Sequence, residues 1–167
     1  MRIEIHADGS TKSNPGTAGW GAIIVIENDW TNSETIRQKG YVKSTNNRME
    51  LLGIMTPLKE IIDTAEYAGA DIHLYSDSKY VVNAGSEWIK SWKKRNWRSA
   101  AGSPIANSDL MKEFDNLITI AKPTFHWVKG HAGHAYNERC DILAKDATNL
   151  SDLEIDKGFE DSIKEDL

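Results

Sequence analysis

The hydrophobic pattern of the chain first changes from strand period to helix period at the polar stretch STNNRM, and this change constrains the fold more than any other feature. Before it lie three strand-like segments: residues 3–8 alternate, residues 20–27 form a continuous β-branched run, and residues 33–42 are more polar, as expected near a sheet edge. Their spacers are short enough for an antiparallel meander. After it, apolar residues recur at helical spacing from Asn47 to about Tyr67.

The second half of the chain alternates helices with strands. We expect strands at residues 71–76 and 124–129, and helices at residues 78–85, 86–95, 107–121 and 134–150. Strands reached through a helix should run parallel to the first strand. Pro57 predicts a kink or break in the first helix, because its ring removes a backbone hydrogen bond. Gly85 is expected to separate two short helices, with Ser86 as the N-cap of the second.

Four acidic residues lie where these predicted elements begin or end: Asp8, Glu50, Asp77 and Asp141. Asp8 and Asp77 end strands one and four, and ligands gather at the carboxyl ends of parallel strands. Carboxylate oxygens are the ligands that Mg²⁺ and Mn²⁺ prefer. A cation would also neutralise the repulsion between converging carboxylates. The sequence therefore predicts a divalent-metal site if the fold brings these acids together.

Each of these acids also has a purely structural interpretation. The four alternatives are Asp8 as a turn residue, Glu50 as the partner of Asn47 in a capping box, Asp77 as an N-cap and Asp141 as the ion-pair partner of Lys145. These alternatives stay open as long as each residue is considered alone.

The net charge of −5 belongs almost entirely to the last 17 residues. Residues 151–167 hold 7 of the 25 acidic and 2 of the 20 basic residues, so residues 1–150 carry 18 of each and are formally neutral. Between Glu87 and Arg98 the chain is basic, which indicates a surface for a polyanion or, alternatively, a solvated helix face. We expect residues 151–167 to form an acidic C-terminal tail, partly disordered, after a single domain at residues 1–150.

Length and composition favour a globular, unexported protein. A chain of 167 residues with 40% hydrophobic residues can form a core without disulfides, and its single cysteine, Cys140, permits no internal one. One cysteine favours a reducing compartment, so we expect a cytoplasmic protein. No segment approaches the roughly 20 apolar residues that span a bilayer, so no membrane partner is expected. We expect a monomer.

Five segments together resemble type 1 ribonuclease H: DGSTKSNPG, STNNRMEL, YSDSKYV, WIKSWKKRNW and HWVKGHAGHAYNERCD. They occur in the order and at the spacing of that family, from about Met1 to Leu150. The resemblance implies the α/β ribonuclease H-like fold, a five-stranded mixed sheet with strands 1–3 antiparallel, strands 4 and 5 parallel to strand 1, and helices on both faces. It implies endonucleolytic hydrolysis of the RNA strand of an RNA–DNA hybrid.

The resemblance also implies a catalytic mechanism. Asp8, Glu50, Asp77 and Asp141 match the metal-binding acids of the family, which hold two Mg²⁺ ions roughly 4 Å apart, with Mn²⁺ as a possible substitute. One ion activates water and the other stabilises the leaving 3′ oxygen, giving 5′-phosphate and 3′-hydroxyl products. His131 matches the mobile-loop histidine, whose unperturbed pKa suits proton transfer near neutral pH.

Substrate contacts follow from the same resemblance. Trp92 matches a position that packs on deoxyribose, within a basic protrusion that continues through Lys93, Lys94 and Arg95. Lys43, Thr45 and Asn107 match a pocket for a DNA phosphate, and Asn14, Asn46 and Asn47 match groups that contact the minor groove, where 2′-hydroxyls distinguish RNA. At helical spacing from Trp92, Trp88 is expected to be at least partly buried.

The sequence departs from the family pattern at three places, and two other functions compete with hybrid cleavage. Lys79 is unexpected after Asp77–Ser78, the stretch between Glu50 and Asp77 is a few residues longer than in bacterial relatives, and the acidic tail matches nothing familiar. A junction or strand-transfer nuclease of the same fold would use similar acids, but needs neither the basic tryptophan segment nor GHAGH. A non-catalytic hybrid-binding protein usually lacks one acid, and here all four are present.

Overall fold

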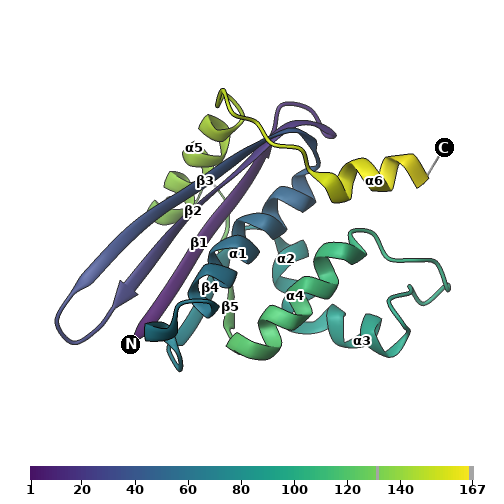
Figure 1. Ribbon diagram of the computed structural model, residues 1–167. Helices are drawn as coiled ribbons and strands as arrows, with labels where there is room; N and C mark the ends of the chain where they lie inside the picture. The colour runs from purple at the N-terminus through teal and green to yellow at the C-terminus, as the bar shows by residue number, and fades with distance from the viewer. Residues whose placement is uncertain (131, 166–167) are drawn as a thin grey trace.

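The computed structural model describes residues 1–130 and 132–165, and within them one five-stranded mixed sheet organises the molecule (Figure 1). The strands are β1 Arg2–Thr11, β2 Gly16–Glu27, β3 Asn32–Ser44, β4 Asp71–Ser76 and β5 Thr124–Trp127, in the order β3-β2-β1-β4-β5. Strands β1, β2 and β3 pair antiparallel, while β4 pairs parallel with both β1 and β5. The predicted sheet is confirmed, including the edge position of the polar strand β3.

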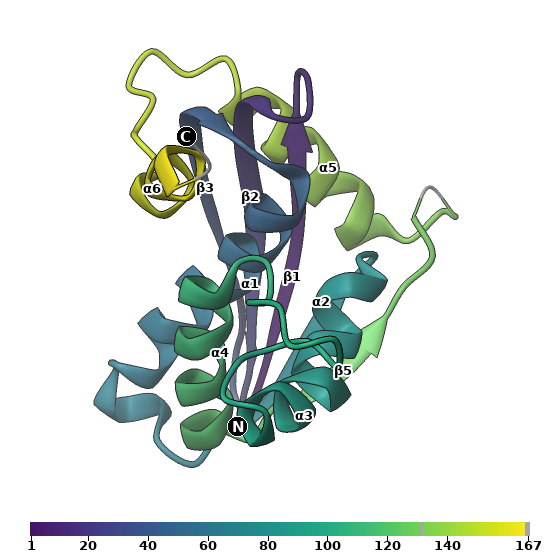
Figure 2. The same cartoon turned by 90° about the vertical axis from the view of Figure 1, so that its right-hand side faces the viewer.

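Helices cover both faces of this sheet, also as predicted (Figure 2). In chain order they are α1 Asn46–Ile62, a 3₁₀ turn at Ala65–Tyr67, α2 Lys79–Asn83, a π-helical turn at Ala84–Trp88, α3 Ile89–Lys94, α4 Ser108–Ala121, α5 Ala135–Ala147 and α6 Lys157–Glu165. Helices α1 and α4 lie on one face and α5 on the other. No helix among the described residues is both long and apolar enough to cross a membrane.

The two faces explain the continuous apolar run of β2. Ile24 packs in the core beneath α1, whereas Ile23 and Val25 pack with Cys140 of α5 on the opposite face. Burying an aliphatic side chain on either side contributes about 1.5–3 kcal/mol. A strand covered on both sides therefore has no polar position, and the sequence shows none from Trp20 to Ile26.

Two local predictions about helix breaks are wrong. Helix α1 continues through Pro57, because Ile54 and Leu58 are fully buried and their packing holds the helix across the missing hydrogen bond. Gly85 does not separate two helices but lies inside the π-helical turn, where its missing side chain makes room for the Phe125 ring. Ser86 is not an N-cap, since its hydroxyl donates to the Val82 carbonyl at 2.6 Å.

The acidic C-terminal segment is more ordered through Glu165 than its composition led us to expect. Its backbone extends the sheet beside β3, with Glu154 N donating to Gly40 O at 2.9 Å. Asp156 is 5% exposed and pairs with the buried Arg48 at 2.8 Å, and Phe159 is buried in the first turns of α6. One buried ion pair and one buried ring are enough to anchor a segment that is otherwise polar.

Candidate active site

Gly9 allows helix α1 to approach strand β1 closely enough to bring Glu50 beside Asp8. A Cβ atom built on Gly9 would lie 2.8 Å from Met49 Cβ and 2.9 Å from the Glu50 backbone nitrogen, so a larger residue would push the helix away. The Gly9 amide also donates to Asp8 Oδ1 at 3.0 Å. The two carboxylates are therefore positioned by a strand and a helix, and the glycine sets the distance between those elements.

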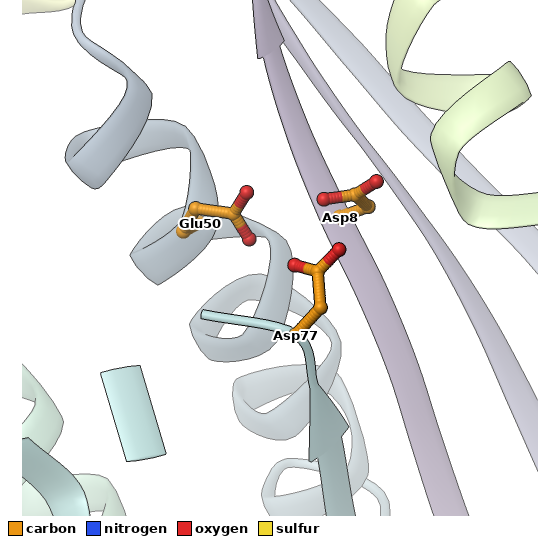
Figure 3. Close-up of side chains that lie close together, drawn as sticks. All are labelled: Asp8, Glu50 and Asp77. Carbon is orange, nitrogen blue, oxygen red and sulfur yellow. The ribbon is translucent and has the colours of Figure 1, made fainter. Parts of the chain in front are cut away.

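Asp77 completes a group of three carboxylates. It follows the last residue of β4, and one carboxylate oxygen from each of Asp8, Glu50 and Asp77 lies within 4.8 Å of the other two. Figure 3 shows the three side chains directed toward one another from β1, from α1 and from the end of β4. Within the described part of the chain, this is the one place where three metal-ligating side chains converge.

The electrostatics of this group call for a cation. Burial, followed by the charge of Asp77, raises the pKa of Asp8 to about 7. Burial and the neighbouring Asp8 likewise raise the pKa of Glu50 well above its usual value. Glu50 Oε2 is buried and has no hydrogen-bond partner among the described residues. An oxygen-rich cluster with an unsatisfied ligand atom and mutually repelling charges fits a divalent metal ion.

Asp141 lies near this group but does not join it. Its carboxylate accepts from Lys145 Nζ at 2.9 Å along helix α5, although its charge still contributes to raising the pKa of Asp8. An exposed pair of this kind is worth about 0.3–0.5 kcal/mol, so turning Asp141 toward a bound ion costs little. Three of the four predicted acids therefore converge, and the fourth is held by Lys145 outside the group.

His131 lies outside the described residues, but the residue before it marks the path of the loop. A Cβ atom on Gly130 would lie 2.9 Å from Asp77 Oδ2, so the backbone passes directly against this carboxylate. The Trp127 ring nitrogen donates to the Asp77 carbonyl at 3.0 Å from the end of β5. His134 has a structural role, because its Nδ1 accepts from Asn137 N and caps α5.

The predicted minor-groove residues gather at the start of α1. Asn46 N donates to Asn14 Oδ1 at 3.2 Å, which ties the β1–β2 turn to the helix. Thr45 is the N-cap of α1 and accepts from Arg48 N. Asn46 and Asn47 are exposed in the first turn, as Asn14 is in its turn. The structure therefore brings these amides together on one surface.

The predicted phosphate pocket is only partly assembled. Asn107 has a left-handed backbone (φ 58°) and its amide donates to Tyr80 OH at 3.1 Å. Its Oδ1 also accepts from Arg48 at 3.4 Å, which joins it to the start of α1. Lys43 is exposed on β3, and its side chain forms no hydrogen bond or ion pair within the described residues. Thr45 and Asn107 are therefore linked through Arg48, and Lys43 is left free to reach a ligand.

The basic tryptophan segment lies on α3 and on its C-cap, Arg95. Trp92 is half-buried against the core, while Lys94 and Arg95 are exposed. Lys93 pairs with Asp115 of α4 at 3.0 Å. Trp88, which was expected to be at least partly buried, is 36% exposed and packs on Trp92 with ring centroids 5.9 Å apart. The segment thus presents Lys94 and Arg95 to solvent, and neither pairs with a carboxylate among the described residues.

Sequence analysis missed Arg48, which connects several of these elements. Its guanidinium binds Asp109 of α4 and Asp156 of the C-terminal segment, each at 2.8 Å, and only 4% of its side chain is exposed. The sequence did contain a signal for this pairing. Arg48 lies directly before the apolar positions Met49 and Leu51 at the start of a helix, and a buried arginine must be paired.

Comparison with known proteins identifies the family. Residues 1–149 match the RNase H family model. The ribonuclease H of Pseudoalteromonas atlantica is 42% identical over 158 residues, which cover 95% of this chain and 97% of that protein. The crystal structure of LC9-RNase H1, a type 1 RNase H with the type 2 active-site motif, has a TM-score of 0.78 at 26% identity, covering 96% of this chain and 79% of that one.

A further solved structure has the same fold. LC11-RNase H1, crystallised in complex with an RNA/DNA hybrid, matches with a TM-score of 0.65 at 16% identity and covers 89% of this chain and 97% of that one. The predicted fold and the predicted family are both confirmed by these matches. By its sequence and its fold, this chain belongs to the ribonuclease H family.

Proposed function

We propose that this ribonuclease H cleaves the RNA strand of RNA–DNA hybrids with two Mg²⁺ ions, for which Mn²⁺ can substitute, and leaves 5′-phosphate and 3′-hydroxyl ends. We propose further that it acts as a monomer in the cytoplasm. The observation that carries the proposal is the convergence of Asp8, Glu50 and Asp77, with a buried and unpartnered oxygen on Glu50.

The proposed roles follow from where each side chain lies. Asp8, which is buried, and Glu50, which is half-buried, form the inner wall of the site and stay in place because a strand and a helix hold them. Asp77, also half-buried, lies against the loop at Gly130. When bound, divalent ions would stabilise charge on the scissile phosphate and lower the pKa of an attacking water. Asp141 leaves Lys145 to complete the ligand set, and His131 moves a proton at the leaving group.

Hybrid recognition would use two surfaces. The neutral amides of Asn14, Asn46 and Asn47 suit the RNA 2′-hydroxyl, which both donates and accepts hydrogen bonds. The exposed cations Lys94 and Arg95, with Trp92, suit the DNA backbone. LC11-RNase H1, with the same fold, was crystallised with an RNA/DNA hybrid. Binding through backbone groups predicts little preference for base sequence.

The test compares an RNA–DNA hybrid, duplex RNA, duplex DNA and single strands, each with Mg²⁺, with Mn²⁺ and with EDTA. Only the hybrid should be cut, only in its RNA strand, and only with metal present. Asp8→Asn should abolish cleavage while hybrid binding survives, and Asp29→Asn in an exposed turn is the matched control that keeps activity. Cutting of duplex DNA would favour a junction nuclease, and binding without any cutting would favour a non-catalytic hybrid-binding protein.

A further inference from the structure

Two histidines on the sheet face that carries α5 have their ring nitrogens directed at each other. His73 Nδ1 of β4 lies 2.7 Å from His126 Nε2 of β5, and the two ring planes are only 23° apart. Both side chains are partly exposed, and neither belongs to the carboxylate group. The strand register produces this contact: His126 is opposite Tyr75, so it lies diagonally across from His73 on the same face.

We propose that His73 Nδ1 and His126 Nε2 form a second metal site, which binds a divalent transition ion such as Zn²⁺ or Ni²⁺ independently of the catalytic ions. Imidazole nitrogens favour these ions over Mg²⁺, which prefers oxygen ligands. Water completes the coordination on the exposed side. The two sites therefore prefer different ions, because His73 and His126 offer nitrogen ligands whereas Asp8, Glu50 and Asp77 offer oxygen ligands.

An outer carboxylate orients the first ligand. Asp71 Oδ2 lies 3.0 Å from His73 Nε2, the nitrogen on the far side of the ring. A histidine that binds metal through one nitrogen commonly donates its other N–H to a carboxylate, which fixes the tautomer. Arg2 Nη1 competes for the same nitrogen at 2.8 Å, and binding would release it to its other partners, Glu4 and Tyr75.

The charges around the pair do not oppose a cation. Glu4 and Asp71 balance Arg2 and the N-terminal ammonium near the two rings, so no net positive charge repels a bound ion. Burial, with a smaller effect from His73, lowers the pKa of His126, so this ring is the neutral ligand that metal binding requires at pH 7. Tyr75 stacks on His126 with ring centroids 4.4 Å apart and holds the ring on the sheet face.

The rearrangement needed is small. A tetrahedral ion with Zn–N distances of about 2.0–2.1 Å requires nitrogens about 3.3 Å apart, so the present separation of 2.7 Å must open by about 0.6 Å. Strand β5 is a four-residue edge strand, which can adjust by this amount. A bound ion would tie this short strand to β4, directly before Trp127, whose ring donates to the Asp77 carbonyl.

The proposal is tested by recording NMR spectra of the histidine side chains in the unsubstituted chain. Excess Mg²⁺ is present to occupy the carboxylate site. Titration with Ni²⁺ should broaden the imidazole signals of His73 and His126 first among the five histidines. Zn²⁺ should raise the melting temperature of the same sample. A titration that broadens other histidines before these two, or broadens none, overturns the proposal.

Variants provide the second measurement. By calorimetry in excess Mg²⁺, His126→Gln should weaken Zn²⁺ binding at least tenfold, and His73→Gln should do the same. His134→Asn is the matched control: it removes one imidazole but keeps an acceptor that caps α5, and it should leave binding unchanged. Unchanged affinity in both glutamine variants would mean that the pair only shares a proton, and the site does not exist.

Discussion

At the scale of single residues, the carboxylate of Asp8 lowers the stability of the metal-free protein, although the proposed metal site requires it. Its carboxylate is buried beside Glu50 and Asp77, and this placement raises its pKa to about 7. Without metal, the ionised Asp8 carboxylate therefore has a higher free energy in the folded protein than in the unfolded chain, and its ionisation destabilises the fold. Sites that bind cations commonly cost the empty protein stability in this way.

Asp8→Asn should stabilise the metal-free protein while it abolishes cleavage. Removing one repelling charge should raise the free energy of unfolding by roughly 1–3 kcal/mol at pH 8 in EDTA. Urea denaturation measures this change, and Asp29→Asn, at an exposed turn, should leave the unfolding free energy within about 0.5 kcal/mol of its original value. A destabilised Asp8→Asn variant would show that the carboxylates do not repel each other in the fold.

The structure tests the purely structural interpretation of each acid. Asp8 lies inside β1 rather than in a turn. The N-cap of α1 is Thr45, so Glu50 forms no capping box with Asn47, and the N-cap of α2 is Ser78 rather than Asp77. The pair of Asp141 with Lys145 is real. Sequence showed which acids were candidates, but it could not show the rotamer that holds Asp141 away from the others.

At the scale of elements, Arg48 joins α1, α4 and the C-terminal segment. Its two carboxylate partners come from Asp109 and Asp156, and Ser44 also donates to Asp156 at 2.6 Å. Breaking a buried pair leaves an uncompensated charge in the interior, which is more costly than losing a surface pair. The N-terminus of α1, with its exposed amides, depends on this junction for its position.

Asp156→Ala should therefore destabilise the protein strongly. We expect the free energy of unfolding to fall by about 3–5 kcal/mol, as is typical when one partner of a buried ion pair is removed. Chemical denaturation measures the loss. Asp161→Ala is the control on the same segment, because its exposed pair with Lys157 is worth only a few tenths of a kcal/mol. Equal effects of the two changes would contradict a specific anchor at Asp156.

The same junction predicts an acid-dependent loss of stability. The Arg48 guanidinium lowers the pKa of Asp109 below its usual value. A carboxyl whose pKa is lower in the folded state adds stability above the unfolded value of about 3.9 and loses it as the pH falls through the folded value. Asp109→Asn should therefore lose less unfolding free energy than the unsubstituted chain between pH 5 and pH 2. A parallel decline in both proteins would contradict this linkage.

Breaks within helices were the features predicted least well from the sequence. A proline or a glycine predicts a break from local backbone chemistry alone, whereas Ile54 and Leu58 keep α1 continuous by packing, and the Phe125 ring fits against Gly85. Neither outcome is local, because α1 is held by packing in the core and Phe125 lies far along the chain from Gly85. The apolar periods that located β1, β2 and α1 need no such information, because burial on one or both faces determines them directly.

At the scale of the whole molecule, charge is segregated. Residues 1–150 are formally neutral, the exposed part of α3 is basic, and the acidic residues of the C-terminal segment cluster around α6. A chain without a net positive charge that binds a polyanion must do so through a local basic patch, so affinity should depend on few ion pairs and on salt.

Hybrid affinity should fall steeply as salt rises, and Lys94→Ala should reduce the slope of log K against log salt by about 1. Lys59→Ala is the control, because Lys59 pairs with Asp63 near the end of α1. Fluorescence anisotropy with a labelled hybrid in Ca²⁺ measures both. An unchanged slope for Lys94→Ala would show that α3 does not contact the nucleic acid backbone.

The topology was predictable from sequence because alternation, burial and connection length each gave the same answer. The C-terminal segment was not, because composition averages over residues, and a single buried carboxylate decides whether this segment packs. The surface pair of His73 and His126 was equally hidden, since only the strand register brings the two residues together.

The pairing of Arg48 with Asp156 has a consequence during protein synthesis. Asp156 leaves the ribosome 108 residues after Arg48, so a growing chain can form β1, β2, β3 and α1 while the guanidinium still lacks this carboxylate. The start of α1 would thus stay loosely held in the nascent chain until Asp156 has emerged. The order of synthesis makes the exposed amides at the start of α1 a late-forming surface.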